Sequence, residues 1–416
     1  MMMKYSLDKF FFLVFGVLAF THSALLSAEP FVTESGIEVA PGVKAQFGQN
    51  DNLLLASESK NAVSSSFLFL DPSISLRFQP REHEFLLSYK LSNGRYFSSS
   101  NDDFTDHTFE SRNIVRIGFR HAVRADFRIA KSHEARGTGL SEGDGTSTAI
   151  DRPLDFLQRS AVTTYTYGAS GAQGQIEAKL GYSDVEYLNF RNLGGTNDNR
   201  STRFKDFDNR YAGLRFSYQW LAHTKAIVEY EFAKKTYALT ANGVPSLDSN
   251  TNSYYAGLEW DPTGKIKGYA KIGLQDKDFL DSDREDFTGV SWSIGMGWSP
   301  YYHSTWSINT EQVARDPDQD GDYVKDSNVN IVWKHYWRTQ IYTRAVVAAK
   351  SQEYTGAFQD GELRDDKSFE WSANVGYEFN ERIDFSVGVR KINKTSSWEG
   401  YGYDQMIWSV SGSIAY

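Results

Sequence analysis

Alternation of polar and apolar residues is the dominant pattern of this chain, and it is clearest in residues 406–416. Successive side chains of a β-strand point to opposite faces, so strict alternation predicts a strand with one apolar face. One parity here carries Trp408, Val410, Gly412, Ile414 and Tyr416, and the other carries Ser409, Ser411, Ser413 and Ala415. The pattern predicts a C-terminal amphipathic strand that ends on an aromatic residue.

The same alternation recurs along the chain from residue 36, and it predicts about eighteen strands, an even number that brings both ends of the chain to one side. Three later apolar faces illustrate it: Ala212, Leu214, Phe216, Tyr218 and Trp220; Val290, Trp292, Ile294, Met296 and Trp298; Phe369, Trp371, Ala373, Val375, Tyr377 and Phe379. Many of the aromatic residues fall at strand ends, which is typical of the interfacial girdles of a membrane barrel.

Connections between the strands alternate in length. Short connections are expected at 79–83, 170–174, 221–224, 261–265 and 380–382, and long ones at 97–111, 137–155, 188–209, 238–251 and 354–365. A soluble β-sandwich has no reason to alternate in this way, whereas outer-membrane barrels combine short periplasmic turns with long extracellular loops. We therefore predict an all-β, transmembrane, antiparallel up-and-down barrel, which must close because lipid cannot satisfy an open sheet edge.

The first residues resemble a secretory signal peptide, with Lys4 and Lys9 before an apolar run at 10–20 that is too short to span a bilayer as a helix. Cleavage after Ala28 is expected, so residues 1–28 are assigned to the signal and 29–416 to the barrel. The alternative is an uncleaved anchor helix. The predicted location is the outer membrane of a Gram-negative bacterium, with outer-membrane lipid, lipopolysaccharide and the barrel-insertion machinery as partners.

Composition argues against several classes of function. The chain has a formal net charge of −9 and no cysteine, which argues against a nucleic-acid partner and against disulfide or thiol chemistry. Histidines are few, and none stands at a convincing spacing from a serine or carboxylate; His133 beside Glu134 comes nearest. We therefore expect no enzyme activity and no cofactor, apart from the calcium hypothesis given below.

The inward-facing parity carries most of the charge. Its basic residues on four early strands, with one acidic residue between them, are Arg77, Lys90, Arg112, Arg116, Arg120, Arg124, Asp126 and Arg128. Rings of arginine and lysine select anions in pores, so these residues are candidates for a path for anionic solutes or acidic sugars. The other interpretation is a lattice of ion pairs that braces the wall.

Inward tyrosines are expected at Tyr211, Tyr255, Tyr269 and Tyr342. A sugar can lie on such a ring while the phenol binds its hydroxyls, but packing within the barrel would place the same residues there. Farther along, Asp316, Asp318, Asp320 and Asp322, with Gly321, form D-x-D-x-D-G-D, which is similar to the first half of a calcium loop. Ser327 stands where that motif has a glutamate, so a solvated acidic loop is the alternative.

Several stretches resemble a family of β-barrel porins that is often encoded with exopolysaccharide or capsule genes. They are GVKAQFGQNDN at 42–52, DPSISLRF at 71–78, YKLSNGRYF at 89–97, DFTDH at 103–107 and RADFRIAKSHEARGTG at 124–139. The resemblance is most specific before about residue 140 and implies a role in exporting a surface polysaccharide together with periplasmic export components.

Three functions remain open: a polysaccharide conduit, a general or anion-preferring porin for small solutes, and an adhesion or scaffold barrel that transports nothing. High steady conductance would favour the porin. A pore closed by residues 137–155 or 188–209 would fit a gated conduit or a scaffold.

Overall fold

The computed structural model describes residues 31–193, 200–359 and 361–416. The expected signal segment, residues 1–28, lies outside them. Within the described residues, β-strands dominate, and the short elements between them are η2 (Ser59–Asn61), η3 (Ser100–Asp102), η4 (Gly139–Ser141), α1 (Asp144–Ala149) and η5 (Thr202–Phe204). None of the helices described is long and apolar enough to cross a membrane.

The strands form one antiparallel sheet in chain order. They are β2 (Ile37–Asn50), β3 (Ser65–Phe78), β4 (Glu84–Tyr96), β5 (Phe104–Ile117), β6 (His121–Glu134), β7 (Leu154–Tyr167), β8 (Gly174–Tyr187), β9 (Phe207–Leu221), β10 (Thr224–Tyr237), β11 (Ser249–Trp260), β12 (Ile266–Phe279), β13 (Phe287–Tyr301), β14 (Ser304–Arg315), β15 (Tyr323–Tyr336), β16 (Ile341–Gln359), β17 (Glu362–Asn380), β18 (Ile383–Ser396) and β19 (Tyr403–Ala415). A two-residue strand, β1 (Phe31–Val32), pairs with the start of β2.

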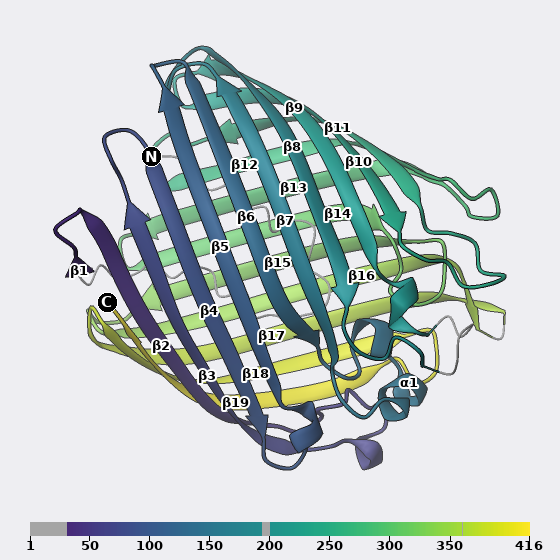
Figure 1. Ribbon diagram of the computed structural model, residues 1–416. Coiled ribbons are helices and arrows are strands. Elements are labelled where there is room, and N and C mark those ends of the chain that lie inside the picture. The colour runs from purple at the N-terminus through teal and green to yellow at the C-terminus, as the bar shows by residue number, and fades with distance from the viewer. Residues whose placement is uncertain (1–30, 194–199, 360) are drawn as a thin grey trace.

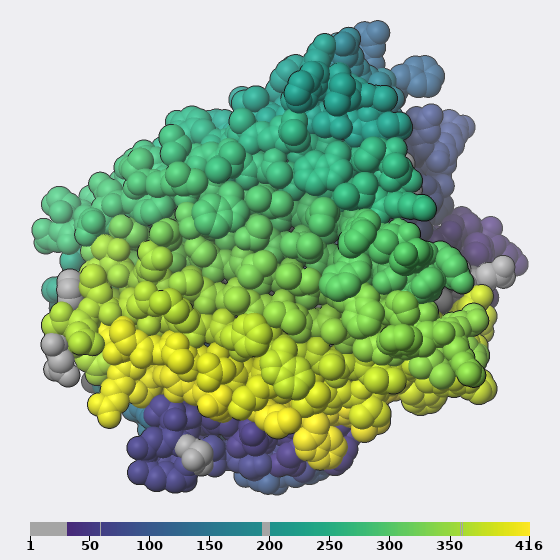
Figure 2. Space-filling model, turned by 180° about the vertical axis from the view of Figure 1, so that it is seen from behind, coloured from purple at the N-terminus to yellow at the C-terminus, as the bar shows by residue number. Residues whose placement is uncertain are grey.

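The sheet closes on itself because β19 pairs with β2, from Ile407 opposite Asn50 to Ala415 opposite Gly42. The closed wall runs around a single barrel in Figure 1, and from behind its yellow C-terminal end lies beside the purple N-terminal end (Figure 2). The predicted eighteen-strand antiparallel barrel is therefore confirmed over the described residues, and β1 is an addition at its rim.

The two ends of the barrel differ as predicted. At one end the connections are tight, for example 118–120 and 222–223, and at the other they include 51–64, 135–153 and 238–248. Two expected long loops are shorter than predicted. The connection expected at 97–111 ends at 103, where β5 begins, and the one expected at 354–365 is a hairpin, because β16 and β17 continue for 19 residues each before they turn. The helix α1 lies at the long-loop end, opposite β1 and the C-terminus (Figure 1).

Side-chain parity divides the wall into two faces. Apolar residues on one parity are highly exposed, for example Leu180 at 67%, Leu214 at 57% and Val228 at 60%. Such exposure is costly in water but natural for a surface that contacts lipid. The opposite parity carries the charged residues described next, so polar side chains line the interior.

Candidate functional site

The predicted arginine rows on β5 and β6 lie on the lumenal parity of neighbouring strands. Asp126 lies between two of them: Arg112 Nε donates to it at 3.0 Å, and Arg124 forms an ion pair with it at 2.6 Å. Arg128 pairs with Glu110 at 3.1 Å, and Arg116 donates to the backbone carbonyl of Glu82 at 2.6 Å. Two wall carboxylates, Asp126 and Glu110, therefore offset part of the positive charge of these four arginines.

Arg120 was expected to extend these rows, but the structure places it elsewhere. It ends the 118–120 turn between β5 and β6, and its carbonyl accepts a hydrogen bond from the amide of Gly168. Gly118 has φ +62°, which favours glycine and fixes the turn there. Arg120 therefore lies outside the strand ladder.

Arg77 and Lys90 lie on β3 and β4 and are about half exposed. Arg77 pairs with Glu84 at 3.1 Å, and Lys90 lies 3.9 Å from Asp71. Across the barrel the same alternation of charge continues in the pairs Lys179–Glu231, Lys271–Glu229, Lys334–Glu378 and Arg390–Glu370. The lumen is lined by a lattice of paired charges rather than by a field of one sign.

The four predicted tyrosines face the lumen, and each stands directly opposite a glycine on the neighbouring strand: Gly181, Gly273, Gly295 and Gly376 for Tyr211, Tyr255, Tyr269 and Tyr342. A Cβ on Gly181 would lie 2.1 Å from the ring of Tyr211, and one on Gly376 equally close to that of Tyr342. These two rings therefore lie flat against the wall in spaces that only glycine leaves.

Lysines lie near the tyrosine rings as well. The ammonium of Lys271 lies 4.4 Å from the ring centre of Tyr255, and that of Lys334 lies 4.2 Å from that of Tyr342. Cations over aromatic faces are stabilising contacts. The tyrosines thus engage the wall on more than one side, which favours the packing interpretation over a free stacking surface for sugars.

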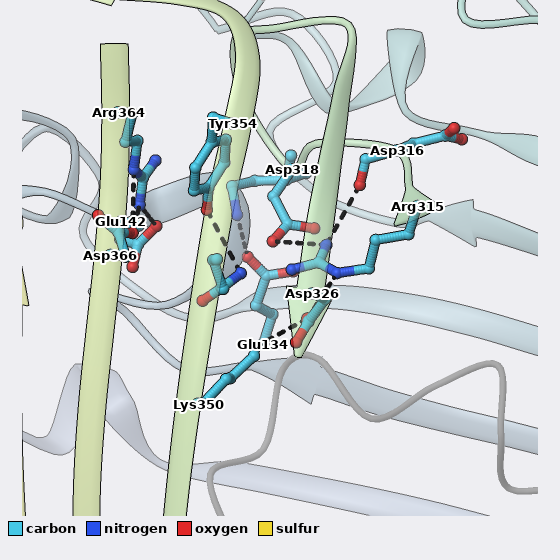
Figure 3. A network of polar contacts seen from close by, with 12 residues as sticks. Glu134, Glu142, Arg315, Asp316, Asp318, Asp326, Lys350, Tyr354, Arg364 and Asp366 are labelled. Carbon is cyan, nitrogen blue, oxygen red and sulfur yellow. Dashed lines mark hydrogen bonds and ion pairs between the residues drawn. The ribbon is translucent and has the colours of Figure 1, made fainter. Parts of the chain in front are cut away.

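The loop between β6 and β7, residues 135–153, reaches from its own strands to the strands at the end of the chain. Its Glu142 forms ion pairs with Arg364 of β17 and Lys394 of β18, and both cations also pair with Asp366, at 2.6 and 2.9 Å. Figure 3 shows Glu142 against Arg364 and Asp366. Since β6 and β17 are far apart in the strand order, this loop spans the extracellular mouth.

Further contacts hold the same loop. The side-chain amide of Gln319 donates to the carbonyls of Leu140 and Glu142 at 3.1 and 2.9 Å, and its oxygen accepts a hydrogen bond from Tyr401. Asp144 accepts hydrogen bonds from the amide and hydroxyl of Ser57. The loop is therefore tied to the β2–β3, β14–β15 and β18–β19 connections as well as to β17 and β18.

The acidic loop 316–322 does not bring its carboxylates together. Asp316 pairs with Lys277 at 2.6 Å and Lys235 at 2.7 Å, whereas Asp322 pairs with Arg284 at 3.1 Å. Asp318 lies 3.8 Å from Arg315, and no group of three metal-ligating side chains occurs among the described residues. The calcium site expected from Asp316, Asp318, Asp320 and Asp322 is thus not assembled, because cations from the protein hold three of these carboxylates, those of Asp316, Asp318 and Asp322.

Asp316 is the most strongly held of these carboxylates, with a side chain only 5% exposed. Burial alone would raise its pKa, but the charges of Lys235 and Lys277 outweigh burial and hold the pKa well below its ordinary value. The carboxylate is therefore ionised at neutral pH and joins the ends of β10, β12 and β14.

The sequence pattern did not indicate a role for several residues at the mouth: Glu142, Gln319, Arg364, Asp366 and Lys394. They come from segments distant in sequence, and alternation says nothing about contacts between loops. The unusual length of the β6–β7 connection was the one available signal. His133, the residue nearest to a catalytic pattern, stacks on Phe104 and contacts Asp106 at 3.0 Å.

The closed barrel, its apolar outer face and its charged lumen define a β-barrel channel protein of the outer membrane. The chain belongs to the family described as Putative beta-barrel porin 2, whose model matches residues 38–414. It is accordingly an outer-membrane protein of a Gram-negative bacterium, and its family is one of porins rather than enzymes.

Solved structures with a similar outline include two Pseudomonas aeruginosa proteins. OpdO is 11% identical with a TM-score of 0.47, over 91% of this chain and 97% of that one. The outer-membrane protein opdK is 11% identical with a TM-score of 0.48, over 91% and 99%. The siderophore receptor PirA of the same organism is 9% identical with a TM-score of 0.45, over 90% and 80%. No curated protein matches the chain.

Proposed function

We propose that this porin-family barrel is a gated outer-membrane conduit that takes part in exporting an extracellular or capsular polysaccharide. The main support for a gate is the position of the β6–β7 loop. Its Glu142 forms ion pairs with Arg364 and Lys394 across the mouth. A permanently open pore has no need of such a tie. An export conduit must instead stay closed to external solutes when no polymer occupies it.

The choice of polymer rests on two supports. The stretches at 42–52 and 124–139 resemble porins encoded with exopolysaccharide or capsule genes, and the lumen presents hydrogen-bonding groups on every wall. Paired charges such as Lys271 and Glu229 offer both donors and acceptors to sugar hydroxyls. The conduit would receive its polymer from separate periplasmic export components and would sit among lipopolysaccharide in the outer leaflet.

A general porin for small solutes is the second candidate. It is favoured by the lumenal lattice, in which Asp126 and Glu110 offset most of the charge of Arg112, Arg124 and Arg128. A wall balanced in this way admits polar solutes with little preference for their charge. A scaffold barrel that transports nothing would be recognised by the absence of conductance both with the loop and without it.

Surface polymer on intact cells tests the proposal. Cells lacking the chain should lose surface polysaccharide, and complementation with the wild-type gene should restore it. A variant in which Phe127 is replaced by leucine, on the outer face, is the matched control and should also restore it. An unchanged amount of surface polysaccharide in the deletion strain would contradict the export role. The small-solute porin would then be the remaining transport function.

A further inference from the structure

A cavity of about 380 Å³ lies at the mouth among four extracellular connections, between β8 and β9, β10 and β11, β12 and β13, and β14 and β15. Its walls include Lys205, Leu239, Thr240, Val244, Pro245 and Asp320. The volume falls within the range of about 300–1,000 Å³ that small-molecule sites occupy. The arginine rows and the lumenal tyrosines contribute nothing to it.

Five charged residues line this cavity: Lys205, Asp283, Arg284, Asp320 and Asp322. Two of opposite sign, the half-buried Lys205 and the exposed Asp320, lie on its wall without forming an ion pair. Among the described residues, neither Lys205 nor Asp320 has a hydrogen bond or ion pair through its side chain, although each attracts the other across the space. Burial lowers the pKa of Lys205 even though Asp318 and Asp320 oppose that change. The neighbouring Arg284 is by contrast fully engaged, with Asp322 and with the carbonyls of Pro245, Ser246 and Gly321.

The chemistry of the cavity limits what it can hold. A singly charged ligand would satisfy only one of Lys205 and Asp320 and would be repelled by the other. A hydroxyl group can donate to a carboxylate and accept from an ammonium group, so a pair of adjacent hydroxyls can bridge the two. Leu239, Val244 and Pro245 offer an apolar wall for the C–H face of a ring.

We infer that this cavity is a carbohydrate-binding subsite for one or two neutral sugar units, in which Lys205 and Asp320 bind adjacent hydroxyls. The ligand class rests on the proposed export function, whereas the location rests on the cavity alone. Gln319 lines the cavity and also holds the β6–β7 loop, so the subsite lies where a polymer leaving the lumen would emerge.

Saturation-transfer NMR on the purified full-length protein in detergent micelles tests the subsite. The probes are methyl β-glucoside, methyl β-galactoside and N-acetylglucosamine, with glucuronate as an acidic comparison. At least one neutral sugar should bind, and more tightly than glucuronate. Asp320→Asn and Lys205→Met should each weaken binding about tenfold, the loss of one charged hydrogen-bonding partner.

Glu285→Gln is the matched control, because Glu285 is exposed in the β12–β13 connection and lies outside the cavity wall. It should bind the probes as the wild type does. Failure of all three neutral sugars to bind the wild type would overturn the subsite, and so would equal binding by Asp320→Asn and Glu285→Gln.

The deletion strain distinguishes failure of the sugar-binding subsite from failure of the proposed export function. If the polymer persists on cells lacking the chain while the purified protein binds sugar, the export role fails and the subsite stands. If the polymer is lost but no sugar binds, the export role stands and the subsite is overturned.

Discussion

The buried ion pairs at the mouth of this barrel and the exposed ion pairs on its wall differ in how much water reaches them. At the mouth the side chains of Arg364 and Lys277 are 3% and 5% exposed, whereas on the wall those of Arg128 and Arg77 are 37% and 49% exposed. The same chemistry therefore fixes geometry at the mouth and leaves these exposed wall pairs adaptable.

The difference has an energetic consequence. Breaking a buried pair by removing one partner costs about 3–5 kcal/mol, because a charge is left buried without its counter-ion. An exposed pair contributes about 0–1 kcal/mol and rearranges easily. Exposed wall charges such as Arg77 and Arg128 can thus exchange partners with a passing solute, while the mouth holds its shape until several contacts break together.

Asp316→Asn should have the largest effect on stability, about 3–5 kcal/mol, because it leaves Lys235 and Lys277 buried without their shared counter-charge. Thermal unfolding in detergent, followed by circular dichroism, measures it. Asp320→Asn, in the same loop, is the control and should unfold at the same temperature as the wild type. Equal unfolding temperatures for the two variants would show that burial at the mouth does not strengthen its ion pairs.

The stabilisation from Asp316 should also depend on pH. Its folded pKa is depressed below the ordinary 3.8, so its contribution is complete above that value and is lost as the pH falls below it. The difference in unfolding temperature between wild type and Asp316→Asn should stay constant from about pH 7 to about pH 5 and shrink towards about pH 2. A difference that grows on acidification would contradict this assignment.

Gly181→Ala should have an intermediate effect, of about 1–3 kcal/mol, because the new methyl group would meet the ring of Tyr211 at 2.1 Å. Gly174→Ala on the same strand is the control, since the nearest atom there is 3.6 Å away. Adding Tyr211→Leu should recover part of the loss in the first variant. Additive losses in the double variant would mean that ring and glycine do not share one space.

Charge reversal in the arginine rows should change stability least, by under about 1 kcal/mol per exposed pair. Arg116→Glu, Arg124→Glu and Arg128→Glu together should move the reversal potential in planar bilayers towards cation selectivity, because the lumen loses positive charge. Arg120→Glu, in the turn, should leave it unchanged. An unchanged potential in the triple variant would limit these rows to bracing the wall.

The sequence alone predicted the barrel, because lipid outside and water inside impose alternation on every strand. That rule placed Tyr211 and Arg124 on the lumenal face without any knowledge of their partners. It could not place Arg120, whose position depends on where the Gly118 turn begins. It also could not extend β16 and β17 beyond the membrane, where no lipid enforces a pattern.

The mouth shows where a local motif misleads. The spacing of Asp316, Asp318 and Asp322 suggested calcium, since acidic residues that repel one another need positive charge. Here that charge comes from Lys235, Lys277 and Arg284, which are distant in sequence and become neighbours only when strands β10 to β14 pair into the sheet. Glu142 was unpredictable for the same reason.

Single-channel conductance tests the gate most directly. Wild-type protein and a variant in which residues 139–149 are replaced by a short glycine-serine linker would be compared in planar bilayers. We expect low steady conductance for the wild type and a severalfold increase for the variant, with Glu142→Ala in between. Equally high conductance in all three proteins would contradict a gate formed by the β6–β7 loop.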